Sequence, residues 1–245
     1  MGRVHFIGGE KGGVGKSLTS RLLAQFFIDM KKAFTGFDLD QSHGTFSRFY
    51  PEYTSPIRVD DFSSLDSILE LAEAKPDHDL IVDLAAQTSG RLQKWIEDSD
   101  VFDAFDELGY QVFLWHVMDD GADSMMLLDK TLDTYSNPNL RFIVVQNMGR
   151  GVNFENFQQS STFQKVTQRP VYFVTLKQLE PKLAQKIDFS NSSFWAAANN
   201  RQIMSIVERK RVGVWLRNTY LQFVPFLARP QTPDLQSVQT QQQQL

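Results

Sequence analysis

A glycine-rich segment at residues 8–17 restricts the fold of this chain more than any other feature of its sequence. It follows an apolar run at residues 4–8, and leucines and phenylalanines then recur at helical spacing across residues 17–31. A strand, a glycine-rich loop and a helix in this order form the setting in which phosphate-binding loops occur. We therefore expect a strand–loop–helix unit at the start of an α/β domain.

Further apolar runs alternate with helical patterns along the chain. Because these runs are continuously apolar, they are typical of strands buried on both faces of a parallel sheet. The sequence thus predicts an α/β fold with a mostly parallel central sheet and helices on both faces, in three α/β/α layers. We expect one domain at residues 1–229 and a polar, disordered tail at 230–245. The expected strands lie at residues 33–38, 80–84, 112–118, 142–146 and 171–174, and the expected helices at 65–74, 125–135 and 203–223.

Composition excludes several classes of protein. The chain has no cysteine, which rules out disulfides, thiolate zinc sites and cysteine-ligated iron–sulfur clusters. Its formal net charge of −4 gives no attraction for nucleic acid over the whole molecule. We see no signal-peptide pattern and no apolar run near the ~20 residues of a membrane span. We therefore expect a cytoplasmic protein.

The residue types of the loop suit the binding of a nucleotide's phosphates. Gly12, Gly13 and Gly15 permit backbone conformations in which N–H groups form an anion nest, and the following helix adds its positive end. Lys16 is expected to contact the β- and γ-phosphates, and Ser17 to ligate Mg²⁺. A glycine-rich turn with chance lysines is the alternative interpretation, which six matching positions disfavour. The predicted nucleotide-binding residues of this segment are Gly12, Gly13, Val14, Gly15, Lys16, Ser17 and Leu18.

One departure from the usual phosphate loop narrows the class of nucleotide-binding protein that the sequence indicates. Glu10 replaces the first glycine, and Lys11 stands ahead of the run Gly-Gly-Val-Gly-Lys-Ser. This pattern resembles the deviant Walker A motif of the MinD/ParA family, within the SIMIBI class of P-loop NTPases. The resemblance covers roughly residues 2–150. It implies a nucleotide-dependent homodimer with ATP and Mg²⁺ between the subunits, in which Lys11 reaches the partner's nucleotide.

Acidic residues at two strand ends extend the resemblance. Asp38 and Asp40 follow the second expected strand; by resemblance Asp40 positions the attacking water and Asp38 lies near Mg²⁺. Asp83 ends a Walker B-like strand and is expected to reach Mg²⁺ through a water. Solvated loop acids and a strand-capping Asp are the alternative interpretations. Gln41 replaces the family's proline, and Gln87 stands where a glycine often meets the γ-phosphate, which leaves the rate of hydrolysis open.

Asn147 is the candidate for contact with the base. It follows the expected strand at 142–146, and in the family an Asn at such a position often hydrogen-bonds adenine. An ordinary turn residue explains Asn147 equally well.

The last helical region is rich in basic residues. ParA-like members bind DNA non-specifically through surface basics of this kind, although an ordinary solvated helix face is the favoured interpretation. MinD-like members end in an amphipathic basic helix; this chain ends in prolines and glutamines, so we expect no direct membrane binding. The candidate DNA-binding residues are Arg201, Arg209, Lys210 and Arg211.

Three functional hypotheses remain from the sequence. The first is an ATPase switch, slow and stimulated by a protein activator, that dimerises around Mg-ATP and positions or partitions a partner. The second is an ATP-dependent small-molecule ligase or kinase on the same fold, and the third a weakly hydrolysing nucleotide-binding scaffold. Within the family, residues 38–49 look more like plasmid mobilisation or conjugal-transfer ATPases than chromosomal ParA.

Overall fold

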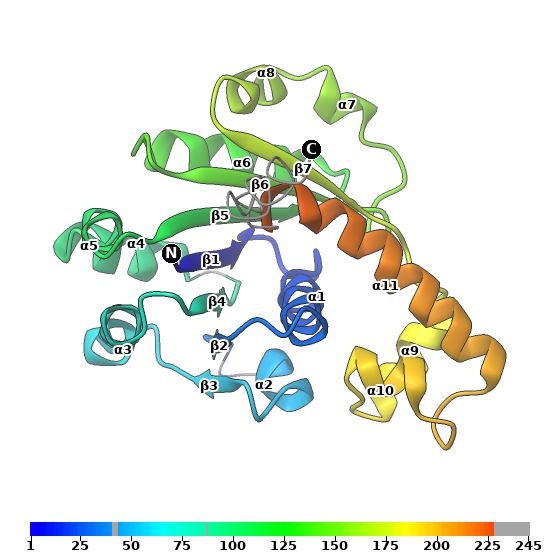
Figure 1. Ribbon diagram of the computed structural model, residues 1–245. Helices are drawn as coiled ribbons and strands as arrows, with labels where there is room; N and C mark the ends of the chain where they lie inside the picture. Colours follow the sequence, from blue (N-terminus) through cyan, green and yellow to red (C-terminus); the bar gives the residue numbers. More distant parts are fainter. Residues whose placement is uncertain (41–43, 87, 228–245) are drawn as a thin grey trace, which may run out of the picture.

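Seven parallel strands form the central sheet of the computed structural model, which describes residues 1–40, 44–86 and 88–227 (Figure 1). Their spatial order is β3-β2-β4-β1-β5-β6-β7, and each neighbouring pair is parallel. The predicted fold class is therefore confirmed. The strands are β1 (Arg3–Gly8), β2 (Phe34–Asp38), β3 (Thr54–Pro56), β4 (Asp79–Asp83), β5 (Gln111–Met118), β6 (Arg141–Asn147) and β7 (Val171–Leu176).

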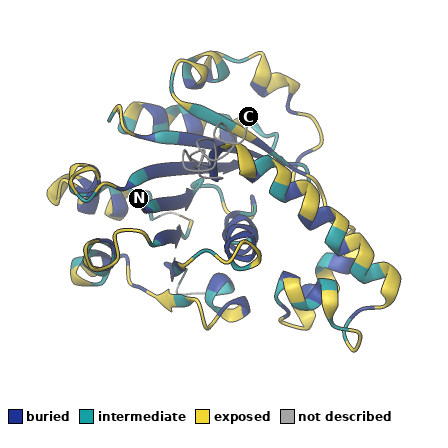
Figure 2. Ribbon diagram, in the orientation of Figure 1, coloured by how far each residue is buried: buried dark blue, intermediate teal, exposed yellow. Residues whose placement is uncertain are grey.

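Helices cover both faces of the sheet, as expected. On one face pack α1 (Lys16–Asp29), α2 (Thr45–Phe49), α9 (Pro181–Phe189), α10 (Phe194–Asn199) and α11 (Ile206–Leu227). On the other face pack α3 (Phe62–Ala74), α4 (Ser89–Asp98), α5 (Val101–Glu107), α6 (Ala122–Thr134), α7 (Glu155–Gln158) and α8 (Ser161–Thr167). Figure 2 shows the inner strands β2, β4, β1, β5 and β6 mostly in the buried colour between these two layers, whereas the edge strands β3 and β7 are mostly intermediate or exposed.

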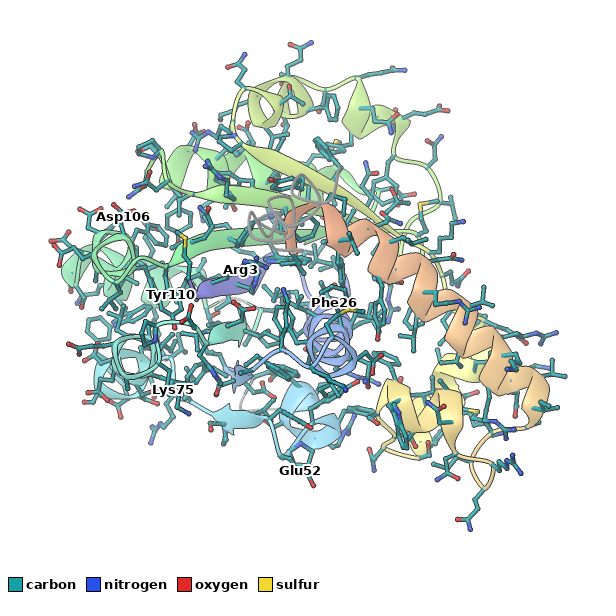
Figure 3. All side chains as sticks on the ribbon, viewed as in Figure 1. Arg3, Phe26, Glu52, Lys75, Asp106 and Tyr110 are labelled. Atoms are coloured by element: carbon teal, nitrogen blue, oxygen red, sulfur yellow. The ribbon has the colours of Figure 1, made fainter. Side chains whose placement is uncertain are left out.

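The alternation of side chains along each strand explains the continuously apolar runs. On β5, Phe113 and Trp115 belong to the core under α1 and α11, whereas Val112 and Leu114 belong to the core under α3 to α6. Both faces of the strand are thus buried, which favours apolar residues at most of its positions. Tyr110, just before β5, joins the sheet to the end of α3, because its hydroxyl donates to the carbonyl of Lys75 at 2.7 Å (Figure 3).

The sequence patterns missed the short elements. β3 has three residues, one of them Pro56, and lies at the sheet edge, so it carries no apolar run. The helices α2, α4, α5 and α7 to α10 have ten residues or fewer and give little periodicity. The expected tail at 230–245, Gln41 and Gln87 lie outside the described residues. The division into one domain and a tail stays a prediction.

The topology brings the predicted site residues together at the carboxyl ends of the strands. β1 is flanked by β4 and β5, and the glycine-rich loop leaves its carboxyl end. In register, Asp83 of β4 pairs with Ile7 of β1 on one side and with Asp38 of β2 on the other. Ligands of open parallel sheets bind just outside the carboxyl ends of the strands. Within the described residues, no helix is both long enough and apolar enough to cross a membrane.

Candidate functional site

The backbone of the glycine-rich loop follows the prediction at Gly13 and Gly15, whereas the φ angle of Gly12 lies outside the region that favours glycine. Gly9, Gly13 and Gly15 have φ angles of 124°, 76° and 107°, in the region that favours glycine. Gly15 caps the amino end of α1, and a Cβ there would lie 2.4 Å from Nδ2 of Asn147. At Gly12 and Gly13 a Cβ would meet no described residue within 4 Å. The loop is thus packed tightly at Gly15 and open where phosphates are expected to bind.

Lys16 is held inside this loop. It is buried, and its Nζ donates to the Lys11 carbonyl at 3.0 Å. Burial lowers the pKa of the Lys16 ammonium, and the carboxylates of Asp83 and Asp40 oppose this shift. Asp40 therefore acts on Lys16 electrostatically, although it belongs to a different strand end.

Asp38 and Asp83 form a buried acidic pair at adjacent strand ends. Both are almost fully buried, at 2% and 1% exposure. The carboxylate of Asp38 accepts hydrogen bonds from the backbone N–H groups of Asp40 at 3.0 Å and Ser47 at 2.8 Å. Asp38 thus fixes the course of the chain on both sides of residues 41–43.

The carboxylate of Asp83 is less well supplied with hydrogen bonds than that of Asp38. Its Oδ1 accepts a hydrogen bond from the Ser20 hydroxyl at 2.9 Å, whereas Oδ2 has no partner of hydrogen-bonding geometry within the described residues. Burial, reinforced by repulsion from Asp38, raises the pKa of Asp83 to about 7, and the hydroxyls of Ser17 and Ser20 oppose this rise. A buried carboxylate oxygen without a partner is costly unless something binds it.

These groups fit a magnesium ion. Ser17, Asp38 and Asp83 would supply hard oxygen ligands, which Mg²⁺ prefers, and Oδ2 of Asp83, which has no partner among the described residues, would be an acceptor for it. The described chain has no cluster of three or more His, Cys, Asp or Glu side chains able to hold a metal. Magnesium bound with phosphates needs no such cluster, since it keeps several waters and takes one or two carboxylates.

Lys11 lies beside a residue that the sequence analysis did not single out. Its Nζ is 2.7 Å from Oδ2 of Asp119, just beyond the carboxyl end of β5. Oδ1 of Asp119 accepts from the Ser124 hydroxyl and the Gly121 N–H. The hydrogen bond to Asp119 raises the pKa of Lys11. An acidic residue after a central parallel strand is the signal that could have identified Asp119.

Asn147 braces the loop from β6. Its side chain is buried, with Nδ2 donating to the Val14 carbonyl at 2.7 Å and Oδ1 accepting from the Gly149 N–H at 3.0 Å. Both ends of the amide are therefore bound within the protein. The predicted contact with adenine stays a prediction, and the bracing of the loop is a role that the sequence analysis missed.

A cavity of about 300 Å³ opens next to Asn147. Arg21 is buried in its wall, with its guanidinium 3.4 Å from the ring centroid of Phe49 and its NH1 3.2 Å from a carboxylate oxygen of Asp188. The loops after β6 and β7 complete the wall. Other lining residues are Leu18, Arg150, Gln178 and Trp215.

The candidate DNA-binding residues lie on α11 or just before it. Arg201 and Lys210 are exposed. Arg211 pairs with Glu180 at 2.9 Å, and Arg209 donates to the Met204 carbonyl at 2.8 Å. Two of the four cations are therefore engaged within the protein, which weakens the case for a DNA-binding patch and agrees with the favoured interpretation of a solvated helix face.

Comparison with known proteins finds a relative of this chain in sequence. No family model matches the chain. MobD from Acidithiobacillus ferrooxidans is 23% identical over 210 residues, which cover 85% of this chain and 92% of MobD.

Two solved structures share the fold. The septum site-determining protein MinD from Pyrococcus horikoshii OT3, complexed with Mg-ADP, is 12% identical with a TM-score of 0.53; the match covers 89% of this chain and 95% of MinD. A plasmid partition protein from Borrelia burgdorferi B31, bound to AMPPNP, is 12% identical with a TM-score of 0.50; the match covers 92% and 99% of the two chains. This chain therefore has the fold of the MinD/ParA-type P-loop NTPases.

Proposed function

We propose that this protein is a Mg²⁺-dependent ATPase that works as a nucleotide-controlled switch. One observation carries the proposal: the glycine loop with Lys16 lies at the same carboxyl end of the sheet as the buried pair Asp38 and Asp83, and an oxygen of Asp83 has no hydrogen-bond partner among the described residues. A loop that only turned the chain would not need buried carboxylates and a buried ammonium beside it.

The loop and the neighbouring cavity would divide the nucleotide between them. The backbone N–H groups of residues 12–17 and the start of α1 bind the phosphates, and the Lys16 ammonium leaves the Lys11 carbonyl to contact them. The cavity of about 300 Å³, which Leu18 and Asn147 line, takes the base. Ser17, Asp38 and Asp83 hold Mg²⁺, which, when bound, neutralises charge on the phosphates.

Asp40 would orient the water that attacks the γ-phosphate. Its electrostatic effect on Lys16 supports a position near the phosphates. Its backbone N–H is tied to Asp38, so a change around the magnesium site moves Asp40 as well. This link offers a way for nucleotide state to alter the segment that follows β2.

Lys11 would complete the site of a second subunit. Its pairing with Asp119 keeps the ammonium on the surface, one-third exposed, where a second subunit can reach it. We propose that ATP favours a dimer in which Lys11 exchanges Asp119 for the partner's phosphates. The resemblance to MobD supports a role in plasmid mobilisation. We further propose that a protein partner stimulates hydrolysis.

The test combines light scattering with measurement of ATP turnover. With Mg-ATP, the wild type should dimerise and hydrolyse ATP slowly. Asp40→Ala should dimerise without hydrolysing, and Lys11→Ala should bind ATP but remain monomeric. Lys94→Ala removes an exposed lysine on α4 and should match the wild type. If all variants stay monomeric with ATP bound, the switch is wrong, and transfer of phosphate to a small molecule should be sought instead.

A further inference from the structure

The outer face of α11 exposes an apolar stripe. Val207, Val214 and Leu221 are 55%, 46% and 70% exposed. They are seven residues apart, so they lie on one side of the helix. Figure 2 shows exposed positions recurring along α11, while its other side, including Val212 and Phe223, is buried in the core. Single exposed apolar residues are common, but a stripe at heptad spacing is typical of helix packing.

The stripe borders a groove between α11 and α9. The groove has a volume of about 710 Å³, and Leu179, Leu183, Ile206, Val207 and Val214 give it apolar walls. Ile206 is also exposed, at 64%. A contiguous apolar groove of this kind marks a surface that another molecule covers.

Exposed positive charge lies beside the stripe. Lys210 and Arg217 are exposed, and neither forms a hydrogen bond or an ion pair with any described residue. Arg211, on the same helix, is already neutralised by Glu180. Since the whole protein has a formal net charge of −4, these cations form a local basic rim and do not reflect an overall positive charge of the protein.

We propose that this face of α11 docks an amphipathic helix of a partner protein. The apolar stripe of that helix packs on Val207, Val214 and Leu221, and acidic residues at its margins pair with Lys210 and Arg217. Helix-in-groove recognition uses such anchors three, four and seven residues apart. The charges select the partner, because complementary rims steer association and exclude wrong partners.

Two other occupants fit less well. A second copy of α11 would bring its own Lys210 and Arg217 close to those of the first, and like charges in an interface are unfavourable. DNA would gain from the same cations, but its phosphates would have to lie against three exposed aliphatic side chains, which contribute nothing to phosphate binding.

Synthetic peptides test the proposal with the full-length protein. Two fluorescein-labelled helical peptides of about 21 residues carry the same leucine heptads, one with glutamates and the other with lysines at the flanking positions. Their binding is measured by fluorescence anisotropy at low salt, where rim charges act most strongly. Duplex DNA of about 20 base pairs is the third probe. Docking does not depend on the ATPase proposal, so these measurements omit nucleotide.

We expect the glutamate peptide to bind at least about ten-fold more tightly than the lysine peptide. Val214→Glu with Leu221→Glu should weaken it by at least about ten-fold, whereas Met126→Glu, at an equally exposed site on α6, should not. Lys210→Glu with Arg217→Glu should reverse the preference for the two peptides. These side chains are exposed, and thermal melts check that each variant folds.

Three results would overturn the proposal. The first is equal binding of both peptides, or binding unchanged by the Val214 and Leu221 substitutions. The second is DNA binding that depends on Lys210 and Arg217 while the glutamate peptide fails to bind. The third is self-association of the wild type that Leu221→Glu abolishes, which would identify a second copy as the occupant.

Discussion

Replacing Asn147 by alanine separates two roles for this side chain, holding the phosphate loop and contacting the base. In the structure the Asn147 amide spans from β6 to the loop, donating to the Val14 carbonyl at 2.7 Å and accepting from the Gly149 N–H at 3.0 Å. Alanine would remove both hydrogen bonds and leave the Val14 carbonyl without this donor in a buried place.

The size of the effect follows from these two bonds. A buried group left without its partner costs about 1–3 kcal/mol. For a chain of this length, each 1 kcal/mol lowers the melting temperature by roughly 2–4 °C. We therefore expect Asn147→Ala to melt about 2–12 °C below the wild type. Loosening the loop by ~1.4 kcal/mol would also weaken phosphate binding about ten-fold.

Comparison of ATP with tripolyphosphate, which has no base, assigns the role. If Asn147 mainly holds the loop, Asn147→Ala should lose affinity for both ligands by a similar factor. Asn199→Ala is the control, because the Asn199 amide is exposed and bonds only to its own helix. An unchanged affinity for tripolyphosphate with a weaker affinity for ATP would show that Asn147 contacts the base and does not mainly hold the loop.

Three further predictions concern single residues near the loop. Burial lowers the pKa of His116 to about 4, so the stability that its neutral form contributes is present above pH 6.5 and is lost as the pH falls to about 4. In urea unfolding, the free energy of unfolding of His116→Gln should therefore fall by about 3 kcal/mol less over this pH range than that of the wild type. An equal fall in the two proteins would contradict this. Gly15→Ala should lower the melting temperature more than Gly109→Ala, because both glycines have positive φ but only Gly15 has a close neighbour; equal losses would show that backbone strain alone matters. Asp119→Ala releases Lys11 and should lower the protein concentration at which ATP drives dimerisation in analytical ultracentrifugation, and an unchanged concentration would remove Asp119 from the proposed exchange.

The elements with strong patterns were predictable from the sequence. β5 was expected at residues 112–118 and runs from Gln111 to Met118, because burial on both faces leaves a continuous apolar run. α1 was expected to follow the glycine loop and begins at Lys16. Gly13 and Gly15 were predictable because their positive φ angles admit few other residues.

The contacts around the site could not be predicted, since they join segments far apart in the chain. Arg21 looks like an ordinary polar position of α1, yet it is buried between Phe49 and Phe194 and lines the cavity. The partner of Lys11, Asp119, is more than one hundred residues away. The sequence leaves base binding and an ordinary turn equally open for Asn147, whereas its hydrogen bonds to the loop depend on how closely β6 approaches Gly15.

The most direct test of the account is calorimetric titration of ATP with and without Mg²⁺ into the wild type and Lys16→Ala. We expect one ATP per chain for the wild type and for the exposed-lysine control Lys94→Ala, with tighter binding when Mg²⁺ is present. Removal of the buried Lys16 ammonium should weaken binding by about 10–100-fold, the value of a hydrogen bond to a charged group. Equal affinity of Lys16→Ala and the wild type, or no binding by either, would contradict the assignment of this loop as a nucleotide site.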